Sequence, residues 1–153
     1  MQALELKVPP PALILITGVL MWLVSRPAPA FDFFLPERTL VAILIIAGGF
    51  LTGISGVVTF RRAKTTVNPL RPQSATSLVT GGIFAITRNP MYLGGFFMLT
   101  GWAVFLSNAL PFVFLPLYIV YINLFQIAPE ERALNSLFGK EFVAYQSRVR
   151  RWI

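Results

Sequence analysis

The chain has 153 residues, of which 56% are hydrophobic and only 12% are charged. A soluble domain carries roughly twice that share of charge, so the composition argues against a water-soluble fold and predicts a single membrane domain. Cysteine and histidine are absent, which excludes disulfides, thiolate nucleophiles and an imidazole base, and leaves no metal site expected. The net charge of +7 comes from basic residues beside apolar runs, a pattern that indicates membrane lipids rather than nucleic acid as partners.

The first apolar run extends from Pro10 to Val24 and is short for a membrane span. A tilted helix over about residues 10–25 would still cross the hydrocarbon core. A signal peptide is the alternative. The segment before the run has a single Lys balanced by Glu5, and three consecutive prolines open the apolar stretch, so a span is favoured.

The second run, Leu40 to Phe60, has 21 residues without a charge and predicts a span over residues 40–60. At ~1.5 Å per residue it matches the ~30 Å thickness of a bilayer core. Its glycines recur at roughly helical spacing, and Gly49 and Gly53 form a small-xxx-small pair. We interpret this stripe as a surface for close helix packing.

The third run, Met91 to Leu106, and the fourth, Leu110 to Ile127, are separated only by a short polar break at Ser107 and Asn108. Two spans, 91–106 and 110–127, joined by so short a turn form a helical hairpin. Its two far ends must therefore lie close together in space.

Basic residues predict the orientation of these spans. The loop 61–90 and the tail 128–153 are both rich in Lys and Arg, whereas the loop 26–38 has two Arg offset by two acids. We therefore expect an all-α integral membrane protein with about four transmembrane helices, and the inner (plasma) membrane as its location. The loop 61–90, the tail, the active site and both termini would face the cytoplasm.

The tail is expected to form a cytoplasmic, interfacial helical segment. Apolar side chains fall on one helical face, and Gly139 should interrupt the helix at a cost of ~1 kcal/mol relative to Ala. The loop 61–90 is long for a connection and contains the turn signals Asn68-Pro69, Arg71-Pro72 and Gly81-Gly82. The predicted apolar face of the tail comprises Leu134, Phe138, Phe142, Tyr145, Val149 and Trp152.

Two polar clusters flank the predicted hairpin, residues 88–94 before it and Glu130-Glu131 after it. Each has a structural explanation. Asn89 and Pro90 suit the N-cap and first position of a helix, and the two Glu suit a first helical turn. Arg88 could extend to the membrane interface, and Tyr92 could belong to an aromatic belt. Their combination at the two ends of one hairpin favours a functional site.

The same residues carry a family resemblance. The stretch Arg88-Asn89-Pro90-Met91-Tyr92-Leu93-Gly94, then Glu130-Glu131, then Phe138-Gly139 with Tyr145 and Arg151, resembles the isoprenylcysteine carboxyl methyltransferase and phospholipid methyltransferase superfamily. The resemblance covers roughly residues 65–153, including Thr65-Thr66-Val67-Asn68-Pro69, and the first two spans carry no signature. Asn89 stands where His is common, Phe142 where Tyr is usual, and Arg150 where Pro often occurs.

The resemblance implies a cofactor, S-adenosylmethionine, and a set of site residues. Arg88 and Arg151 would pair with a carboxylate, and Glu131 would complete the catalytic set. Because Asn cannot titrate near pH 7, Asn89 would position the cofactor rather than transfer protons. The residues expected to bind the cofactor are Asn89, Pro90, Tyr92, Leu93, Gly94, Glu130, Glu131 and Tyr145.

The expected reaction is methyl transfer to a lipophilic or membrane-partitioned acceptor, a small molecule or a lipidated substrate. A carboxylate such as a prenylcysteine-like group is favoured, because it is anionic at pH 7 and needs no base. A phospholipid amine, with Glu131 or Tyr92 as base, and a small thiol are alternatives. From other classes, an NADPH-dependent enzyme similar to sterol reductases and a non-catalytic lipid-binding membrane protein also stay open.

Overall fold

The computed structural model describes residues 5–64 and 72–153, and helices account for the regular structure in this part of the chain. The motif residues 65–69 and the turn signal at Arg71 lie outside the described residues. Short 3-10 turns form at Pro29–Phe31, Pro72–Ser74 and Gly82–Ala85. The helices are α1 (Pro10–Ser25), α2 (Arg38–Arg62), α3 (Pro90–Leu106), α4 (Phe114–Ile122) and α5 (Ala128–Gln146).

Each predicted apolar run forms a helix where the sequence places it. Two stretches, Arg38–Arg62 and Leu110–Gln146, are long and apolar enough to cross a membrane, while α1 and α3 are shorter apolar helices. The apolar part of Leu110–Gln146 ends at Ile127, and its charged residues begin at Glu130. The all-helical class is therefore confirmed. The number of spans and the cytoplasmic side of the tail stay predictions.

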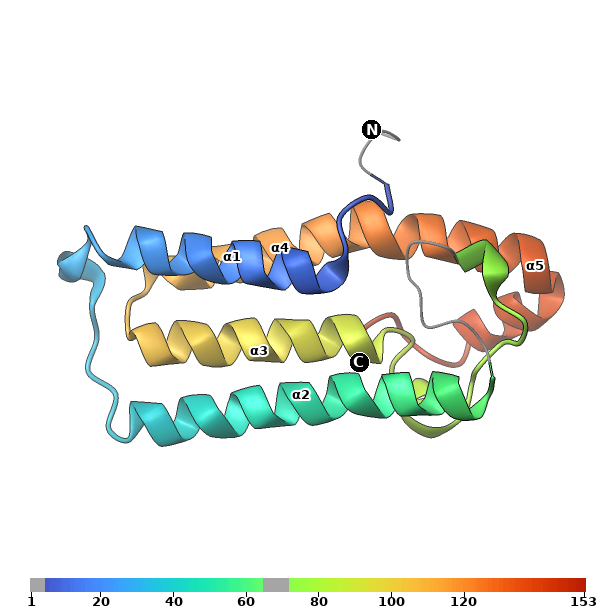
Figure 1. Cartoon of the computed structure of the whole chain (residues 1–153), viewed down its shortest axis with the longest axis horizontal. Helices are drawn as coiled ribbons and strands as arrows, with labels where there is room; N and C mark the ends of the chain where they lie inside the picture. Colours follow the sequence, from blue (N-terminus) through green and yellow to red (C-terminus); the bar gives the residue numbers. More distant parts are fainter. Residues whose placement is uncertain (1–4, 65–71) are drawn as a thin grey trace.

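Helix α3 lies beside α2 and occupies the middle of the bundle (Figure 1). The two helices touch backbone to backbone at the glycine stripe. A Cβ on Gly49 would lie 2.6 Å from the Gly94 carbonyl oxygen, and a Cβ on Gly94 would lie 2.5 Å from the Gly49 oxygen. The expected packing role of Gly49 is thus confirmed. Its partner, Gly94, is one of the residues predicted to bind the cofactor.

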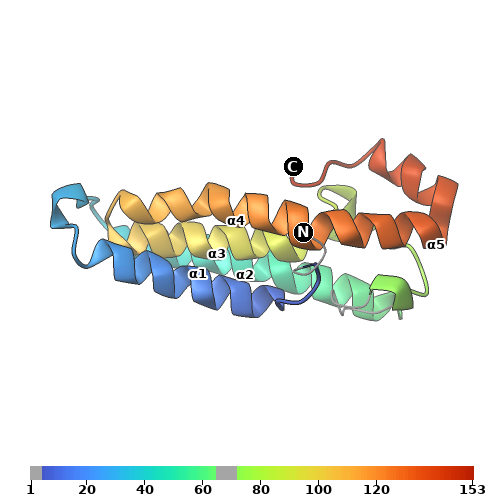
Figure 2. The same cartoon turned by 90° about the horizontal axis from the view of Figure 1, so that it is seen from above.

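Helix α4 does not end at the predicted boundary. A π-helical turn, Asn123–Ile127, carries it directly into α5, and Figure 2 shows the two in one line. The tail therefore begins as a continuation of the last apolar helix, which the sequence analysis did not predict. The expected interruption at Gly139 is confirmed, because this residue adopts φ 47° and ψ −118° inside α5 and the chain turns back there.

Residues of the π turn bind the N-terminal segment. Pro129 has no N–H and cannot donate to the carbonyl of Phe125, which instead accepts a bond from the N–H of Leu6 at 3.0 Å. One residue further on, the fully buried Gln126 donates from Nε2 to the carbonyl of Val8 at 2.9 Å. The chain before α1 is thereby held against the junction of α4 and α5.

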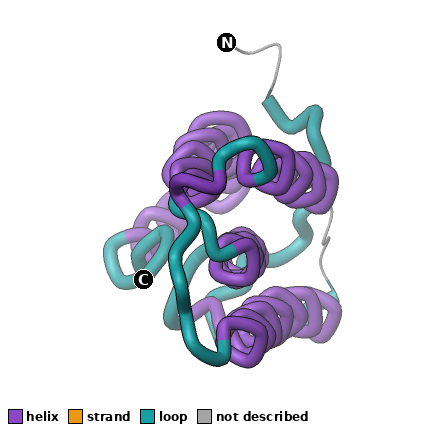
Figure 3. The backbone as a smooth tube through the Cα atoms, turned by 90° about the vertical axis from the view of Figure 1, so that its left-hand side faces the viewer, coloured by secondary structure: helices purple, strands orange, loops and turns teal. Residues whose placement is uncertain are grey.

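The hairpin turn at the opposite end of the bundle, visible end-on in Figure 3, is fixed by one buried amide. Asn108 is fully buried and donates from Nδ2 to the carbonyl of Ala28 at 2.8 Å and to Oδ1 of Asp32 at 2.7 Å. The turn between α3 and α4 is thus bonded to the loop between α1 and α2. This polar end lies a full helix length from the clusters predicted to form a site.

Candidate functional site

The two polar clusters meet, as predicted, where the hairpin brings its ends together. Tyr92, in the first turn of α3, donates from its hydroxyl to Oε2 of Glu130 in α5 at 3.0 Å. Because the helix runs through Ile127 without a break, the two Glu do not lie at a free helix N-terminus. Both Glu lie in the first turn of α5, as the structural explanation expects, but this turn continues the π turn and has no free N-terminus to complement.

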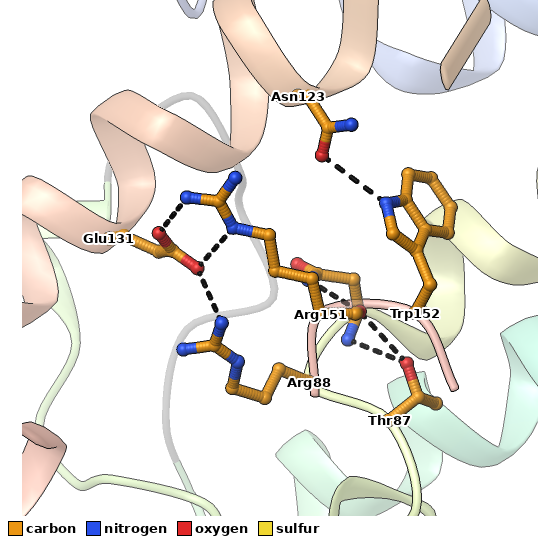
Figure 4. A network of polar contacts seen from close by, with 7 residues as sticks. Thr87, Arg88, Asn123, Glu131, Arg151 and Trp152 are labelled. Carbon is orange, nitrogen blue, oxygen red and sulfur yellow. Dashed lines mark hydrogen bonds and ion pairs between the residues drawn. The ribbon is translucent and has the colours of Figure 1, made fainter. Parts of the chain in front are cut away.

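A three-residue ion cluster lies beside this contact. Arg151 donates to the Glu131 carboxylate through Nε at 3.0 Å and Nη2 at 2.6 Å, and Arg88 Nη2 approaches Oε1 of Glu131 at 3.1 Å. Figure 4 shows both guanidinium groups converging on Glu131 from different segments of the chain. The predicted catalytic set of Arg88, Glu131 and Arg151 is thus one contiguous group. Its net charge is positive.

Backbone hydrogen bonds hold the C-terminal residues in this site. The carbonyl of Arg151 accepts from Thr87 Oγ1 at 3.1 Å and from Asn89 Nδ2 at 2.9 Å. The N–H of Arg88 donates to the carbonyl of Arg150 at 3.0 Å. Asn89 and Pro90 occupy the N-cap and the first position of α3, as the structural explanation expects, but the Asn89 side chain makes no capping hydrogen bond. Its amide instead ties the C-terminal segment to the start of the hairpin.

Burial leaves part of the Arg88 guanidinium without a partner. Its side chain is 12% exposed, and its Nε and Nη1 are buried with no hydrogen-bond acceptor within the described residues. Burial lowers the pKa of Arg88, opposed by the charge of Glu131. A buried cation with two free donors is costly unless an acceptor pairs with it. These donors therefore point to an anionic group as the natural ligand of this position.

Glu130 has a different environment from its neighbour. Burial raises the pKa of Glu130 from 4.5 to about 7; the hydrogen bond from Tyr92 lowers it, and the nearby charge of Glu131 raises it further. The two adjacent carboxylates therefore differ in their surroundings. Glu131 is paired with cations, whereas Glu130 exchanges a proton near neutral pH.

The clusters line a small cavity of about 60 Å³. Its polar wall includes Arg88, Asn89, Glu130 and Glu131. Its apolar wall comes from the end of α2, the segment before α3 and the kinked half of α5. The apolar lining residues include Phe60, Leu78, Val79, Phe84, Leu134, Phe142 and the ring of Tyr145.

Some predicted site residues lie elsewhere. Gly94 is buried against α2, Pro90 lies against Gly56 of the same helix, and Leu93 is buried in α3 without lining the cavity. The hydroxyl of Tyr145 donates to the carbonyl of Phe84 at 2.7 Å, so its proton is not available to a ligand. The cofactor role expected for these residues stays a prediction.

Other residues of the site were not predicted. Thr87 is fully buried and donates to the carbonyl of Arg151, and Asn123 accepts from Trp152 Nε1 at 3.3 Å. The position of Thr87 directly before Arg88 is a weak signal for its role. Asn123 carries none, because only the π turn directs it toward the tail. Among the described residues, no cluster of acidic side chains could hold a metal ion.

The fold is a bundle of apolar helices with a polar site where the two ends of the α3–α4 hairpin meet. These features place the chain among small helical membrane proteins. Comparison with known families then specifies the class. Residues 37–141 match the family described as phospholipid methyltransferase, which covers more than half of the chain. The chain belongs to this family, and the resemblance predicted from its motifs is confirmed. The match includes α2, where no family signature was expected, and it ends before Tyr145 and Arg151.

Individual relatives agree with this assignment. The chain is 29% identical over 106 residues, 69% of its length, to protein-S-isoprenylcysteine O-methyltransferase B of Arabidopsis thaliana, and similarly to a probable enzyme of that name from Oryza sativa. It spans about half the length of these plant proteins, 53% and 56%. An uncharacterized protein of Haemophilus influenzae is 43% identical over 63 residues, which are its full length and 41% of this chain. No solved structure gives a significant match.

Proposed function

We propose that this protein is an integral membrane enzyme that transfers a methyl group from S-adenosylmethionine to a lipophilic acceptor carrying a carboxylate. The family supports the reaction class. The observation that carries the proposal is the buried Arg88 guanidinium, with two free donors beside two carboxylates of unlike charge state. The inner membrane, with the site on its cytoplasmic side, is proposed from the basic loop and tail around the site.

The chemistry of the side chains fits this cofactor. Its amino-acid moiety has a carboxylate that would accept from Nε and Nη1 of Arg88, and an ammonium and ribose hydroxyls that would donate to Glu130 or Glu131. Phe84 and Phe142 line the cavity, where their aromatic rings would contact an adenine or a sulfonium. A cavity of about 60 Å³ is much smaller than the ~300–1,000 Å³ of ligand pockets, so its walls must separate on binding.

We propose that the C-terminal segment moves; it does not line the cavity itself, but it contacts the lining residues Arg88, Asn89 and Glu131. It is held by individual hydrogen bonds from Thr87, Asn89 and the backbone of Arg88, each worth roughly 1 kcal/mol. Its ion pair joins Arg151, whose side chain is 42% exposed, to Glu131. A carboxylate that takes the free donors of Arg88 also competes for the bonds of this cluster. Movement of the segment breaks these bonds and the packing of Val149 and Trp152, while the hairpin stays intact.

In this proposal the residues of the site position the reactants and exclude water. S-adenosylmethionine supplies an already activated methyl group, so the protein needs mainly to hold donor and acceptor in line. Arg88 and Glu131 would hold the polar end of the donor, and Trp152, bonded to Asn123, would cover the site on the tail side. A carboxylate acceptor is the nucleophile itself. No proton transfer, and hence no histidine, is required.

Glu130 favours a second candidate acceptor, a phospholipid amine. An ammonium must lose its proton before it attacks, and a carboxyl whose pKa is about 7 suits that role at neutral pH. The Tyr92 hydroxyl, 3.0 Å away, fixes the orientation of this carboxyl. With an amine acceptor the methylation rate should fall as the pH drops below about 7, because Glu130 becomes protonated; with a carboxylate acceptor it should not depend on Glu130 as a base.

Isothermal titration in detergent tests the proposal. We expect S-adenosylmethionine or S-adenosylhomocysteine to bind, and Arg88→Gln to weaken binding by about 100-fold, because a charged hydrogen-bond pair contributes roughly 1.5–3 kcal/mol. Lys140→Gln, in the exposed part of α5, is the matched control and should bind normally. Binding of NADPH instead would indicate a reductase, and binding of none of the three would refute the proposed enzyme class.

A further inference from the structure

The residues before α1 bind one side of the helix that carries the site carboxylates. Residues 5–8, here called the N-terminal strap, lie against the junction of α4 and α5 (Figure 2). The N–H of Leu6 donates to the carbonyl of Phe125 at 3.0 Å. Gln126 donates from Nε2 to the carbonyl of Val8 at 2.9 Å. Both bonds therefore end on the π turn that joins the two helices.

An ion pair fixes the other end of the strap. Glu5 accepts from Nη2 of Arg132, and the two side chains are 23% and 60% exposed. Phe125 and Arg132 are seven residues apart (132 − 125), about two helical turns, so they lie on the same face of the continuous helix. The strap covers this face. Glu130 and Glu131 lie within the same two turns but face away from it, toward the polar cavity.

The π turn decides the direction in which these carboxylates face. A π turn is wound more loosely than an α-helical turn and contains about one residue more. Closing Asn123–Ile127 into an α-helical turn would therefore rotate α5 by roughly 100°, the angle between consecutive residues of an α-helix. Each side chain of α5 would then face where its successor faces now. Glu131 would leave Arg88 and Arg151 and take the direction of Arg132, which is exposed.

The strap opposes this rotation because it is bonded both within the π turn and beyond it, at Arg132. It also supplies a donor that the helix lacks, since Pro129 has no N–H and the N–H of Leu6 takes its place. Leu6 adopts φ 55°, a left-handed conformation that a non-glycine residue keeps only where its contacts hold it.

Gln126 is the residue of the helix that binds the strap from inside the bundle. It is fully buried, and its Oε1 has no donor within the described residues. A buried amide with one group unpaired is costly. The bond from Nε2 to the carbonyl of Val8 offsets this cost and ties the π turn to the strap.

We propose that Gln126 and the N-terminal strap position the active site: they hold the π turn, and the π turn holds Glu130 and Glu131 facing the cavity. Among the described residues that line this cavity, none belongs to the strap, so the strap acts through α5. The direction of the carboxylates is a matter of structure, whereas their use in methyl transfer rests on the proposed function. Gln126 is thus a positioning residue rather than a catalytic one.

Thiol labelling of the full chain in detergent measures the direction of α5 without methyl transfer. The sequence has no cysteine, so one introduced thiol is the only group that reacts with a water-soluble maleimide. Leu134→Cys reports rotation, because Leu134 lines the cavity and would turn toward the exposed direction of Asn135. Ala133→Cys reports removal of the strap, because Ala133 is buried about two turns after Gln126 on the same face. Ala103→Cys, fully buried in α3, reports loosening of the whole bundle.

Gln126→Leu keeps a buried side chain of similar size but removes the bond to Val8. We expect it to raise the labelling rate of the Leu134→Cys variant about fivefold, because one hydrogen bond shifts an equilibrium by roughly that factor. The rate of the Ala103→Cys variant should stay unchanged. A rise with Ala133→Cys alone would mean that the strap only covers α5, and an equal rise with Ala103→Cys would mean general loosening. Either result overturns the inference, as does the absence of any change.

The ion pair gives a second test, which includes a rescue and does not alter the buried amide. Arg132→Glu places two carboxylates together and should raise the labelling rate of the Leu134→Cys variant about two- to fivefold. Adding Glu5→Arg restores opposite charges and should return the rate to its original value. Lys140→Glu, at an exposed position of α5 beyond the strap, is the matched control and should have no effect. A reversed pair that does not restore the rate would contradict the role of the strap.

Failure of the proposed function has a different signature. If the two carboxylates hold S-adenosylmethionine, Gln126→Leu should also weaken its binding about fivefold in isothermal titration, while Lys140→Glu should not. If the cofactor does not bind the unsubstituted chain, the proposed function fails, but the labelling rates still report the action of the strap. The two ideas are therefore tested separately.

Discussion

Replacement of Glu130 by glutamine keeps the size of the side chain and an oxygen that can accept from Tyr92, but it removes the charge. Burial raises the pKa of Glu130 from 4.5 to about 7, so the folded protein prefers the protonated acid more strongly than the unfolded chain does. This preference contributes fully to stability below pH 4.5 and is lost as the pH rises through 7. Above that pH, folding must keep a partly buried charge.

The size of the effect follows from the pKa difference. The change from 4.5 to about 7 corresponds to roughly 2–3 kcal/mol at 1.36 kcal/mol per pKa unit, after a reduction for residual solvent screening. Glu130→Gln should therefore be more stable than the wild type by that amount at about pH 8, and equal to it at about pH 4. In a domain of this size, 1 kcal/mol moves the melting temperature by about 2–8 °C.

Thermal unfolding in a non-ionic detergent at the two pH values measures this difference. Glu131→Gln is the matched control with the opposite expected sign, because it leaves Arg88 without its ion-pair partner at a side-chain exposure of only 12%. It should destabilise the protein by roughly 2–4 kcal/mol at about pH 8. The reasoning is refuted if Glu130→Gln has the same effect at both pH values, or if both variants are destabilised alike at about pH 8.

Two further predictions concern glycines. Gly94→Ala places a Cβ 2.5 Å from the Gly49 oxygen and should destabilise the bundle by roughly 1–3 kcal/mol in thermal unfolding. Gly48→Ala, where an added Cβ meets open space, should be neutral or stabilising. Equal effects of the two variants would contradict the packing of α2 on α3. Gly139→Ala should cost about 1–3 kcal/mol through backbone strain alone, because φ is 47° and a Cβ added there would have no other atom within 4 Å. Gly81→Ala, at φ −98°, should not destabilise the protein. The same melting experiment measures both.

Much of the fold could be predicted from local sequence. The four apolar runs, the kink at Gly139 and the hairpin around Ser107 and Asn108 follow from run length, turn residues and the cost of glycine in a helix. The meeting of Tyr92 with Glu130 was also predictable, because a hairpin of two spans leaves no other place for its ends. In these cases the information is contained in neighbouring residues.

Other features depend on contacts between distant segments. The continuation of α4 into α5 comes from a π turn, and the docking of Leu6 on Phe125 follows from the missing N–H of Pro129. No local pattern of the sequence indicates that Arg151 would bring its carbonyl to Thr87 and Asn89, across more than sixty residues. The motif likewise gave no reason to place Gly94 on α2 rather than at the cofactor, since close backbone approach suits both roles.

The sequence alone therefore predicted a membrane environment, the helices and the residues from which the site is made, because hydrophobicity and charge are properties of each residue along the chain. The tertiary structure decided which of these residues share a cavity, which carboxylate is paired and which holds a proton near neutral pH. Ion pairing and burial are properties of the surroundings in space. Glu130 and Glu131 are identical and adjacent in sequence, and only their neighbours across the hairpin make them chemically different.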